Sequence, residues 1–546
     1  MNGGIAIPRL RLLASIFLFL FLISWAHVAF LQTYRSAFLR QKGSQQYHVT
    51  ITQHPPRACM YDRHGDPLAL NTMSYAAFIV PSMLENKKET LAFLAQHFPT
   101  AYDKMIKNPQ RKFLYLQRHL SKQQKANLEK MGLSDIQFLC EPSRMYPVPS
   151  LGHTTGITDI DNHGLCGLEW IYEKQLSGQP TTYSLEKEAR SHHYYFQRTT
   201  NVQGIDGKAV TTTLDNNLQF LAYEKLKEHV QTLHAVDGCV VITNPRTGEV
   251  LTMATYPDFD PNESTPSDLS LTKNKICTET REFGSVIKVF PALAAIEEGI
   301  VTPETPINCE NTRRTKINGM PITTWKSCGI LSYADVIRYS NNIGTSKVAL
   351  KLGTKLYDYL CACGFGQRTS INFPGEQDGF ITPPAKWSKA SPLSLSFGYE
   401  IRATPLQLAQ AWSVLANKGK LVPLRLIKDN TTLPAGQQTF SPSSVEQVRN
   451  IISLNNNTNT AYFGNIPGYH IMGKTGTAYL VTDGKYDKKR SLYTFAALVE
   501  KDDYQRVIVT SIREPAPQKK KLYASTAAVP LFKKIAEAML VYDQIV

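Results

Sequence analysis

The sequence lacks several features that would assign it to other classes of protein. It contains no internal repeat. Its 60 Lys and Arg residues outnumber 45 Asp and Glu, giving a net charge of +15. These basic residues are dispersed, however, and no dense basic run adjoins a nucleic-acid-binding motif. We therefore expect no nucleic-acid partner, and the positive charge favours an anionic membrane surface or an acidic polymer instead.

Patterns that bind metals are also missing. Cys361-Ala-Cys363 has neither a histidine nor a second cysteine pair beside it, so we expect no metal site there. The 9 cysteines are an odd number, so at least one lacks an intramolecular partner. Cys309 and Cys328 flank a polar, turn-like stretch. They either close a disulfide, worth about 3 kcal/mol in the chain-entropy model, or stay separate buried thiols.

A long apolar segment without charge is present near the N-terminus. Leu12–Leu31 has about the length needed to span a bilayer. Arg9 and Arg11 precede it, which predicts that residues 1–11 form a short cytoplasmic tail. The alternative is a cleaved signal peptide, with Ser24 and Ala26 as its small-residue pair. Either reading places the bulk of the chain outside the cytoplasm.

The remaining length and composition predict large folded domains. The chain has 546 residues, of which 42% are hydrophobic and 19% charged, so two or three domains with sizeable cores are expected. Residues 32–206 combine short β-rich pieces such as Tyr75–Val80 with a helical pattern over Glu85–Phe98. They contain no grouping of acid, base and nucleophile. We therefore predict a non-catalytic module at 32–206 and a second domain at 207–546.

The second domain begins and ends with strand patterns. Cys239–Ala254 has two β-rich runs around a Pro-Arg-Thr-Gly turn, which predicts a hairpin. The other predicted strands are 210–215, 493–499 and 506–512, and the predicted helices are 216–232, 289–300, 333–350, 405–415 and 529–541. Strands at both ends with helices between them predict an α+β fold, in which the two ends share one antiparallel sheet flanked by helices.

A candidate nucleophile lies in Phe283-Gly-Ser-Val-Ile-Lys288. Gly284 permits a tight turn before a helix, and Ser285 and Lys288 would share one face of that helix. A serine hydroxyl needs a base, and a lysine serves once burial or a nearby cation lowers its pKa. The spacing alone is weak, because Ser184–Lys187 and Ser270–Lys273 share it without the glycine turn and the apolar helix that follows.

Two further segments complete a recognisable set. Ser340 offers a hydroxyl for proton relay and Asn342 an amide for a peptide carbonyl, although alone they would be read as a helix cap. Lys474-Thr-Gly476 occurs once in the chain. On an edge strand its backbone could pair with an extended peptide, and Gly476 would let that peptide approach closely.

The side chains of this third segment suit an anionic ligand. Lys474 supplies positive potential, and Thr475 and Thr477 supply hydroxyls for a carboxylate. Ser-x-x-Lys, Ser-x-Asn and Lys-Thr-Gly in this order are the motif set of penicillin-binding proteins and class A β-lactamases. The sequence therefore predicts one cleft formed by three segments that are far apart along the chain.

With these motifs, the chain resembles the class B penicillin-binding proteins, which are peptidoglycan D,D-transpeptidases, over nearly all its length after the apolar segment. Further segments that carry the resemblance are 62–65, 68–69, 144–147, 152–156, 167–169, 364–366, 374–376 and 404–409. The stretch Gly152–Glu169 and the strand-turn segment after Ala478 are most similar to the septal, penicillin-binding protein 3 type, with the elongation-specific type as rival. Three positions depart from the family pattern: Phe283 replaces a frequent proline, Glu400 a common glycine, and Ala58 the glycine of an Arg-Gly pair.

The resemblance implies a mechanism. Ser285 would be acylated by a stem peptide ending in D-Ala-D-Ala, with Lys288 as its base, and an amine of a second stem peptide would resolve the acyl-enzyme. Ser340 and Lys474 would carry the proton to the leaving nitrogen, and Asn342 would hold the substrate amide. The N–H groups of Ser285 and Thr477 would form the oxyanion hole.

The resemblance also implies ligands, partners and location. β-Lactam antibiotics would acylate the same serine, and the reaction needs no cofactor. The chain would sit in the bacterial inner membrane through a single helix, with its catalytic domain outside the cytoplasm. A polytopic glycan polymerase and other division proteins would be its partners. A β-lactam sensor, a D,D-carboxypeptidase and a β-lactamase remain as alternatives.

Overall fold

The computed structural model describes residues 7–111, 113–187, 194–263, 269–428, 435–455, 461–515 and 522–545. The chain divides into two compact units. The first consists of residues up to Arg57 together with Ser177–Gly207, and the second of Ala58–Leu176 and Lys208–Val546. The boundary predicted after residue 206 lies one residue from a junction between the units. The predicted module at 32–206 contributes to both of them.

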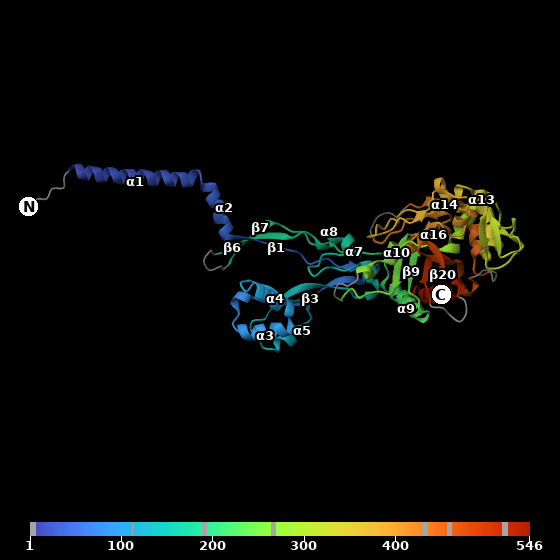
Figure 1. The fold of residues 1–546 in the computed structure, drawn as a ribbon, viewed down its shortest axis with the longest axis horizontal. Coiled ribbons are helices and arrows are strands. Elements are labelled where there is room, and N and C mark those ends of the chain that lie inside the picture. The colour runs from blue at the N-terminus through green and yellow to red at the C-terminus, as the bar shows by residue number, and fades with distance from the viewer. Residues whose placement is uncertain are drawn as a thin grey trace, which may run out of the picture. The chain divides into compact units, whose positions relative to one another are not determined.

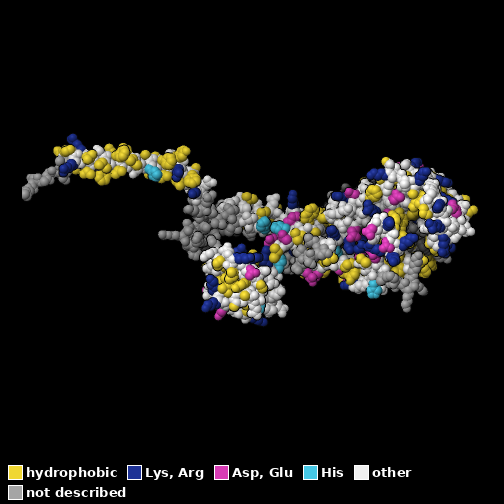
Figure 2. Space-filling model, viewed as in Figure 1, with side chains coloured by type: hydrophobic (Ala, Val, Ile, Leu, Met, Phe, Trp, Pro, Cys, Tyr) yellow, Lys and Arg dark blue, Asp and Glu magenta, His cyan; other side chains and the backbone are white. Residues whose placement is uncertain are grey.

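The first unit carries a long apolar helix and a small sheet. Helix α1 (Ile7–Thr33) contains the predicted span at 12–31, and its described side chains are all exposed apart from one that is partly covered. An 18-residue window of α1 has a mean hydropathy of 2.2, which makes it long and apolar enough to cross a membrane. Figure 2 shows hydrophobic side chains along most of its length. Helix α2 (Ser36–Tyr47) follows, and the antiparallel strands are β1 (His48–Gln53), β6 (Thr181–Lys187) and β7 (Tyr194–Val202).

In the second unit, residues Ala58–Leu176 form the N-terminal lobe. The long strand β3 (Pro67–Ile79) lies at the centre of its sheet, because it pairs with β2 (Met60–Tyr61), β4 (Leu114–Leu120) and β5 (Gln137–Met145). The short β8 (Val210–Thr211) pairs in parallel with β2. The helices of the lobe are α3 (Lys87–His97), α4 (Pro99–Lys107), α5 (Lys122–Glu129), α6 (Gly152–Thr155), α7 (Gly167–Ile171) and α8 (Glu173–Ser177).

The C-terminal domain, Lys208–Val546, is built on a five-stranded antiparallel sheet of order β10-β9-β21-β20-β19. The strands are β9 (Asp237–Asn244), β10 (Glu249–Tyr256), β19 (His470–Thr482), β20 (Lys485–Lys501) and β21 (Tyr504–Arg513). Strand β21 pairs with β9, so the two ends of the domain share one sheet, as predicted. Strand β19, which contains Lys474-Thr-Gly476, lies at the edge of the sheet, also as predicted.

Helices cover both faces of this sheet, because its strands are apolar on both sides. Val240 and Ile242 pack in one core with α9 (Asn216–Thr232) and α19 (Val529–Tyr542). Cys239 and Val241 point to the opposite core, which contains α11 (Val289–Glu297) and α16 (Pro405–Ala416). Figure 1 shows β9 and β20 between α16 and α9. The α+β prediction is thereby confirmed.

The remaining elements surround this three-layer core. The helices are α10 (Lys275–Thr278), α12 (Tyr333–Arg338), α13 (Asn342–Leu352), α14 (Lys355–Ala362), α15 (Ser391–Ser396), α17 (Pro442–Ile452) and α18 (Ala524–Ala527). The short strands are β11 (Pro306–Asn308), β12 (Arg314–Ile317), β13 (Met320–Thr323), β14 (Ile330–Ser332), β15 (Phe380–Ile381), β16 (Ile401–Arg402), β17 (Lys420–Leu421) and β18 (Gln437–Gln438). Short 3₁₀ turns occupy 81–83, 149–151, 269–272, 284–288, 384–386 and 462–464.

Two predicted elements differ from the structure. The strand expected over residues 210–215 is only two residues long, because Asp215 leaves the sheet to cap α9 by accepting from Leu218 N–H at 3.0 Å. The helix expected over 333–350 is two helices, α12 and α13. Ser340 interrupts them with a left-handed φ of +56°. The break exposes the Ser-x-Asn motif at a helix start instead of burying it in a continuous helix.

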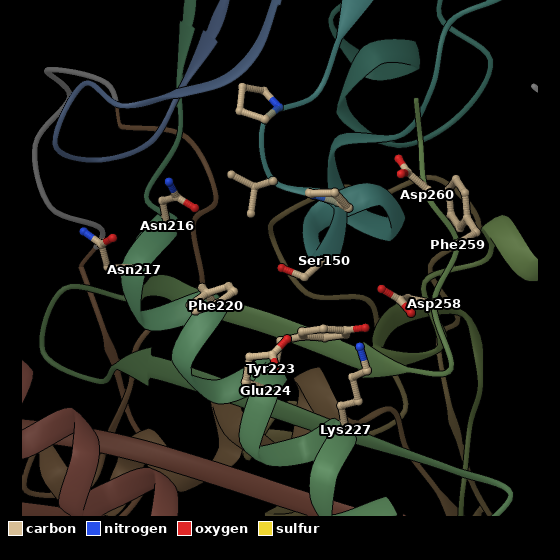
Figure 3. A pocket seen from close by; sticks show the side chains of 13 residues that line it. Ser150, Asn216, Asn217, Phe220, Tyr223, Glu224, Lys227, Asp258, Phe259 and Asp260 are labelled. Atoms are coloured by element: carbon tan, nitrogen blue, oxygen red, sulfur yellow. The ribbon is translucent and has the colours of Figure 1, made fainter. Parts of the chain in front are cut away.

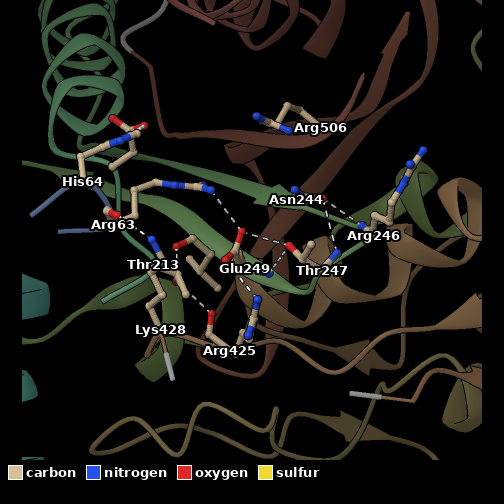
Figure 4. Close-up of polar contacts among 12 residues, drawn as sticks. Arg63, His64, Thr213, Asn244, Arg246, Thr247, Glu249, Arg425, Lys428 and Arg506 are labelled. Atoms are coloured by element: carbon tan, nitrogen blue, oxygen red, sulfur yellow. Dashed lines mark hydrogen bonds and ion pairs between the residues drawn. The ribbon is translucent and has the colours of Figure 1, made fainter. Parts of the chain in front are cut away.

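The motif at residues 62–65 joins the N-terminal lobe to the C-terminal domain. The fully buried Asp62 accepts from His64 N–H at 2.7 Å and from Asn216 N–H at 3.1 Å. Figure 4 shows the neighbouring ion pairs, in which the Glu249 carboxylate lies between the guanidinium groups of Arg63 and Arg425. These contacts give the motif a structural role at the junction.

Cys309 and Cys328 are free thiols in the structure, and both are buried. Burial raises the pKa of Cys309 to about 11. Backbone hydrogen bonds join the two segments, from Cys309 N–H to Gly329 O and from Asn311 N–H to Cys328 O, each 2.8 Å. The structure therefore matches the alternative of separate buried thiols.

A buried ion pair holds two other family-like segments of the lobe together. Arg144 Nε donates to Glu169 Oε1 at 2.7 Å, and the two side chains are 2% and 0% exposed. We expect Glu169→Ala to reduce the free energy of unfolding by about 3–5 kcal/mol, because it leaves the Arg144 charge buried without its carboxylate. Urea denaturation of the full chain in detergent measures this.

The matched control is Asp161→Ala. The Asp161 side chain is 58% exposed, and its loss removes an ion pair with Arg118. This substitution should lower the free energy of unfolding by less than about 1 kcal/mol. Equal unfolding midpoints for Glu169→Ala and Asp161→Ala would contradict the structural role of the buried pair.

Candidate active site

The candidate nucleophile lies on a tight turn at the start of α11. Gly284 has φ +58°, and residues Gly284–Lys288 form a 3₁₀ turn, not the first turn of an α-helix as predicted. A 3₁₀ turn has three residues per turn, so Ser285 and Lys288 lie directly above one another. Ser285 is partly exposed, whereas Lys288 is fully buried. The turn thus presents the hydroxyl to the surface and places the amine beneath it.

The Lys288 amine joins the first two motifs. Its Nζ lies 2.7 Å from Ser340 O, 3.0 Å from Ser340 Oγ and 2.6 Å from Asn342 Oδ1. All three contacts are with Ser340 and Asn342, at the junction of α12 and α13. The structure therefore brings together residues that are more than fifty positions apart in the sequence.

The Ser340–Asn342 segment is itself held in place by short-range contacts. Asn341 caps α13 by accepting from Gly344 N–H at 2.9 Å, which fixes Asn342 as the first helical residue. The Asn342 amide is used at both ends, since its Nδ2 donates to Thr323 O at 2.7 Å. The β12–β13 hairpin thereby contacts the site, and Trp325 Nε1 strengthens this link by donating to Tyr339 O at 2.6 Å.

Strand β19 passes directly against the nucleophile turn. A Cβ added at Gly476 would lie 2.2 Å from Phe283 O, and one added at Gly284 would lie 2.4 Å from Thr477 O. Gly476 was predicted to admit a substrate, but its contact in the structure is with the backbone before Ser285. Thr477 is exposed beside the turn and Thr475 is largely buried. All eight predicted site residues thus belong to three adjoining segments.

Two buried lysines dominate the electrostatics of the site. Burial, followed by the nearby charge of Lys474, holds the pKa of Lys288 well below the ordinary lysine value of 10.5. Burial alone lowers the pKa of Lys474 to about 7. Neither lysine has a carboxylate within ion-pair distance in the part of the chain that the structure describes. Because both ammonium groups are desolvated and repel each other, one of them tends to lose a proton.

Sequence reasoning missed the residues that border β19 beyond Thr477. Glu282 accepts from Glu400 N–H at 3.0 Å and from Tyr486 O–H at 3.1 Å. The Tyr399 hydroxyl accepts from Tyr479 N–H at 3.4 Å. The available signals were the position of Glu282, three residues before Ser285, and the replacement of a common family glycine by Glu400.

A cavity of about 580 Å³ lies elsewhere, between the N-terminal lobe and α9. Figure 3 shows its polar and aromatic lining, which includes Ser150, Phe220, Tyr223, Lys227 and Asp258. It contains none of the predicted site residues. Among the described residues, no group of three or more His, Cys, Asp or Glu side chains is placed to hold a metal ion.

Comparison with known protein families agrees with this geometry. Residues 238–537 match the penicillin-binding protein transpeptidase domain, and residues 52–212 match the penicillin-binding protein dimerisation domain. The chain belongs to the penicillin-binding proteins. The family predicted from the three motifs is confirmed.

Relatives match this penicillin-binding protein over nearly its whole length. It is 31% identical to the probable peptidoglycan D,D-transpeptidase PbpC of Pseudomonas aeruginosa, covering 93% of this chain and 90% of that protein. It is 28% identical to the peptidoglycan D,D-transpeptidase FtsI of Escherichia coli, covering 97% and 91%. Penicillin-binding protein 3 of Mycobacterium tuberculosis, complexed with aztreonam, shares the fold with a TM-score of 0.69 at 24% identity, covering 91% and 98%.

The close contact at Gly476 gives a direct test of the site's packing. We expect Gly476→Ala to destabilise the protein by about 1–3 kcal/mol, because the new methyl group must push the backbone of Phe283 away. Thermal unfolding and labelling by a fluorescent penicillin should both show the loss.

Gly329→Ala is the control, since a Cβ there would meet no heavy atom within 4 Å. It should leave both measurements unchanged. A Gly476→Ala protein that unfolds and labels like wild type would show that β19 does not pack against the nucleophile turn.

Proposed function

We propose that this penicillin-binding protein is a peptidoglycan D,D-transpeptidase that cross-links stem peptides through an acyl-enzyme at Ser285. The observation that carries the proposal is the buried Lys288 amine, which contacts Ser340 and Asn342 one 3₁₀ turn below Ser285. The transpeptidase domain and the names of the relatives support the same reaction.

In the first half of the reaction, Lys288 acts as the base. The neutral amine keeps two N–H donors for Ser340 O and Asn342 Oδ1, which leaves its lone pair for a hydroxyl proton. Ser285 Oγ then attacks the carbonyl of the penultimate D-alanine. The developing oxyanion accepts hydrogen bonds from the N–H groups of Ser285 and Thr477.

The same groups serve the departure of the terminal D-alanine. Its nitrogen leaves after it receives a proton along Ser340, which lies 3.0 Å from Lys288 Nζ, with Lys474 completing the path. Lys474, Thr475 and Thr477 provide positive potential and hydroxyls for the carboxylate of that D-alanine. Gly476 allows the strand that carries these groups to approach Ser285.

In the second half, an amine of a neighbouring stem peptide attacks the ester at Ser285. Lys288 is neutral again once its proton has passed to the departed D-alanine. It takes a proton from the attacking amine and returns one to Ser285 Oγ as the ester bond breaks, and the new amide bond is the cross-link. A β-lactam enters as a mimic of D-Ala-D-Ala and stops after acylation. The reaction uses no cofactor and needs no metal ion.

The apolar helix and the relatives support a proposed location. Helix α1 would cross the inner membrane once, with residues before it in the cytoplasm and the catalytic domain on the outer side. The relationship to FtsI of E. coli supports a role at the division septum, with a polytopic glycan polymerase and other division proteins as partners. The elongation-specific role is the alternative.

Ser285→Ala should abolish covalent labelling, because it removes the hydroxyl that lies one 3₁₀ turn from Lys288. Intact mass after treatment with penicillin should show one adduct on wild type and none on the variant. Ser270→Ala is the control, since Ser270–Lys273 shares the spacing but lies outside the site, and it should label normally. An adduct that persists on Ser285→Ala would show that another residue is the nucleophile.

The rate of acylation should depend on pH through Lys288. Because burial and Lys474 depress the pKa of Lys288, its base form persists to a lower pH than that of an ordinary lysine and is lost as pH falls through the lowered pKa. We expect the acylation rate to level off well below pH 10.5 and to decline towards acid. Stopped-flow measurements across pH test this, with Lys288→Arg inactive throughout. A rate that keeps rising to pH 10.5 would contradict a depressed pKa.

A donor stem peptide supplied together with an acceptor amine separates the transpeptidase from its alternatives. We expect the cross-linked product to form in preference to the hydrolysed donor. Hydrolysis alone would indicate a D,D-carboxypeptidase or a β-lactamase, and acylation without any product would indicate a sensor.

A further inference from the structure

The edge of β19 that faces away from β20 is occupied at two places. Near its start, Leu454 N–H donates to Ile471 O at 2.8 Å. Near its end, Tyr479 N–H donates to the Tyr399 hydroxyl at 3.4 Å. Successive backbone groups alternate between the two edges of a strand, so residues 473, 475 and 477 face the same side as 471 and 479. The substrate-binding segment is thus bounded by a contact at each end.

The outer of these two contacts belongs to a cluster that we name the outer clamp: Glu282, Tyr399, Glu400 and Tyr486. Glu282 Oε1 accepts from Glu400 N–H and from Tyr486 O–H. The rings of Tyr399 and Tyr486 meet edge to face, with centroids 5.0 Å apart. The clamp therefore joins three segments: the one that leads into Ser285, the loop after α15, and the β19–β20 hairpin.

Two features of the clamp point beyond simple packing. Glu400 has φ +58°, a conformation that costs a non-glycine residue energy and that clusters at functional sites. Burial raises the pKa of Glu282, although the Tyr486 hydroxyl, the Glu400 N–H and the charge of Arg402 act the other way. The native state therefore keeps a carboxylate where burial disfavours its charge, three residues before the nucleophile.

We propose that Glu282 is a positioning residue for the transpeptidase reaction, holding the nucleophile turn and β19 at the separation that acylation requires. It acts through the backbone of residue 400 and the hydroxyl of Tyr486, not by touching substrate. The contact between Gly398 and Gly284 shows how closely these segments pack, since a Cβ on Gly398 would lie 2.1 Å from Gly284 O. A small shift of this loop moves the turn, and reaction rates fall steeply when groups are misplaced by even 1 Å.

The inference rests on the proposed function, and the test uses the full-length protein with a fluorescent penicillin. The limiting acylation rate constant and the half-saturating concentration are measured separately, together with thermal unfolding. We expect Glu282→Ala to lower the limiting rate constant about tenfold or more, with little change in the half-saturating concentration. Glu282→Gln should recover most of the rate, because its amide oxygen still accepts from Glu400 N–H.

Tyr486→Phe, which removes one hydrogen bond and keeps the ring, should slow acylation less than Glu282→Ala. It also serves as the deciding variant if Glu282→Ala does not fold. Glu298→Gln is the matched control, because Glu298 accepts from the Tyr359 hydroxyl at 2.8 Å outside the site. It should acylate like wild type.

The inference would be overturned if Glu282→Ala had the acylation rate constant of wild type, or if Glu282→Gln were as slow as Glu282→Ala. If Glu282→Ala does not fold, a wild-type rate constant in Tyr486→Phe would overturn it. A loss that appears only in the half-saturating concentration would likewise assign Glu282 to binding instead of positioning. A wild-type protein that is not acylated at all would contradict the proposed function itself, so the two failures are distinguishable.

Discussion

The buried amine of Lys288 is the interaction on which the site depends. It contacts Ser340 twice and Asn342 once, and it lies one 3₁₀ turn below Ser285. An ammonium group in such surroundings has lost most of its hydration, and Lys474 adds a second positive charge nearby. The fold therefore stabilises the base form of a residue that would be charged on the surface.

The rest of the C-terminal domain serves to keep this amine in place. Helices on both faces fix the five-stranded sheet, and its edge strand β19 packs against the nucleophile turn through Gly476 and Gly284. On the other side, the cap at Asn341 and the hairpin contact at Thr323 hold the second motif. The N-terminal lobe joins the domain through Asp62 and the Glu249 ion pairs. None of these residues belongs to the three motifs of the active site.

Much of this could be predicted from the sequence, for identifiable reasons. Helix α9 and the β9–β10 hairpin follow from apolar spacing and turn residues, because those signals are local. The convergence of Ser285, Ser340 and Lys474 was predicted only because three motifs occur together in a known order. The break between α12 and α13 was not predicted, since a left-handed serine leaves no periodic signal. Glu282 and Tyr399 were missed because their partners lie far away in sequence.

The protonation state of Lys288 tests the account most directly. Lysine side chains can be labelled with ¹⁵N and their resonances followed with pH, with Lys288→Arg used to assign the signal. The account predicts that Lys288 takes up its proton only well below the ordinary lysine pKa of 10.5. A Lys288 that stays protonated up to that value would contradict the central claim, because no base would then be available beside Ser285.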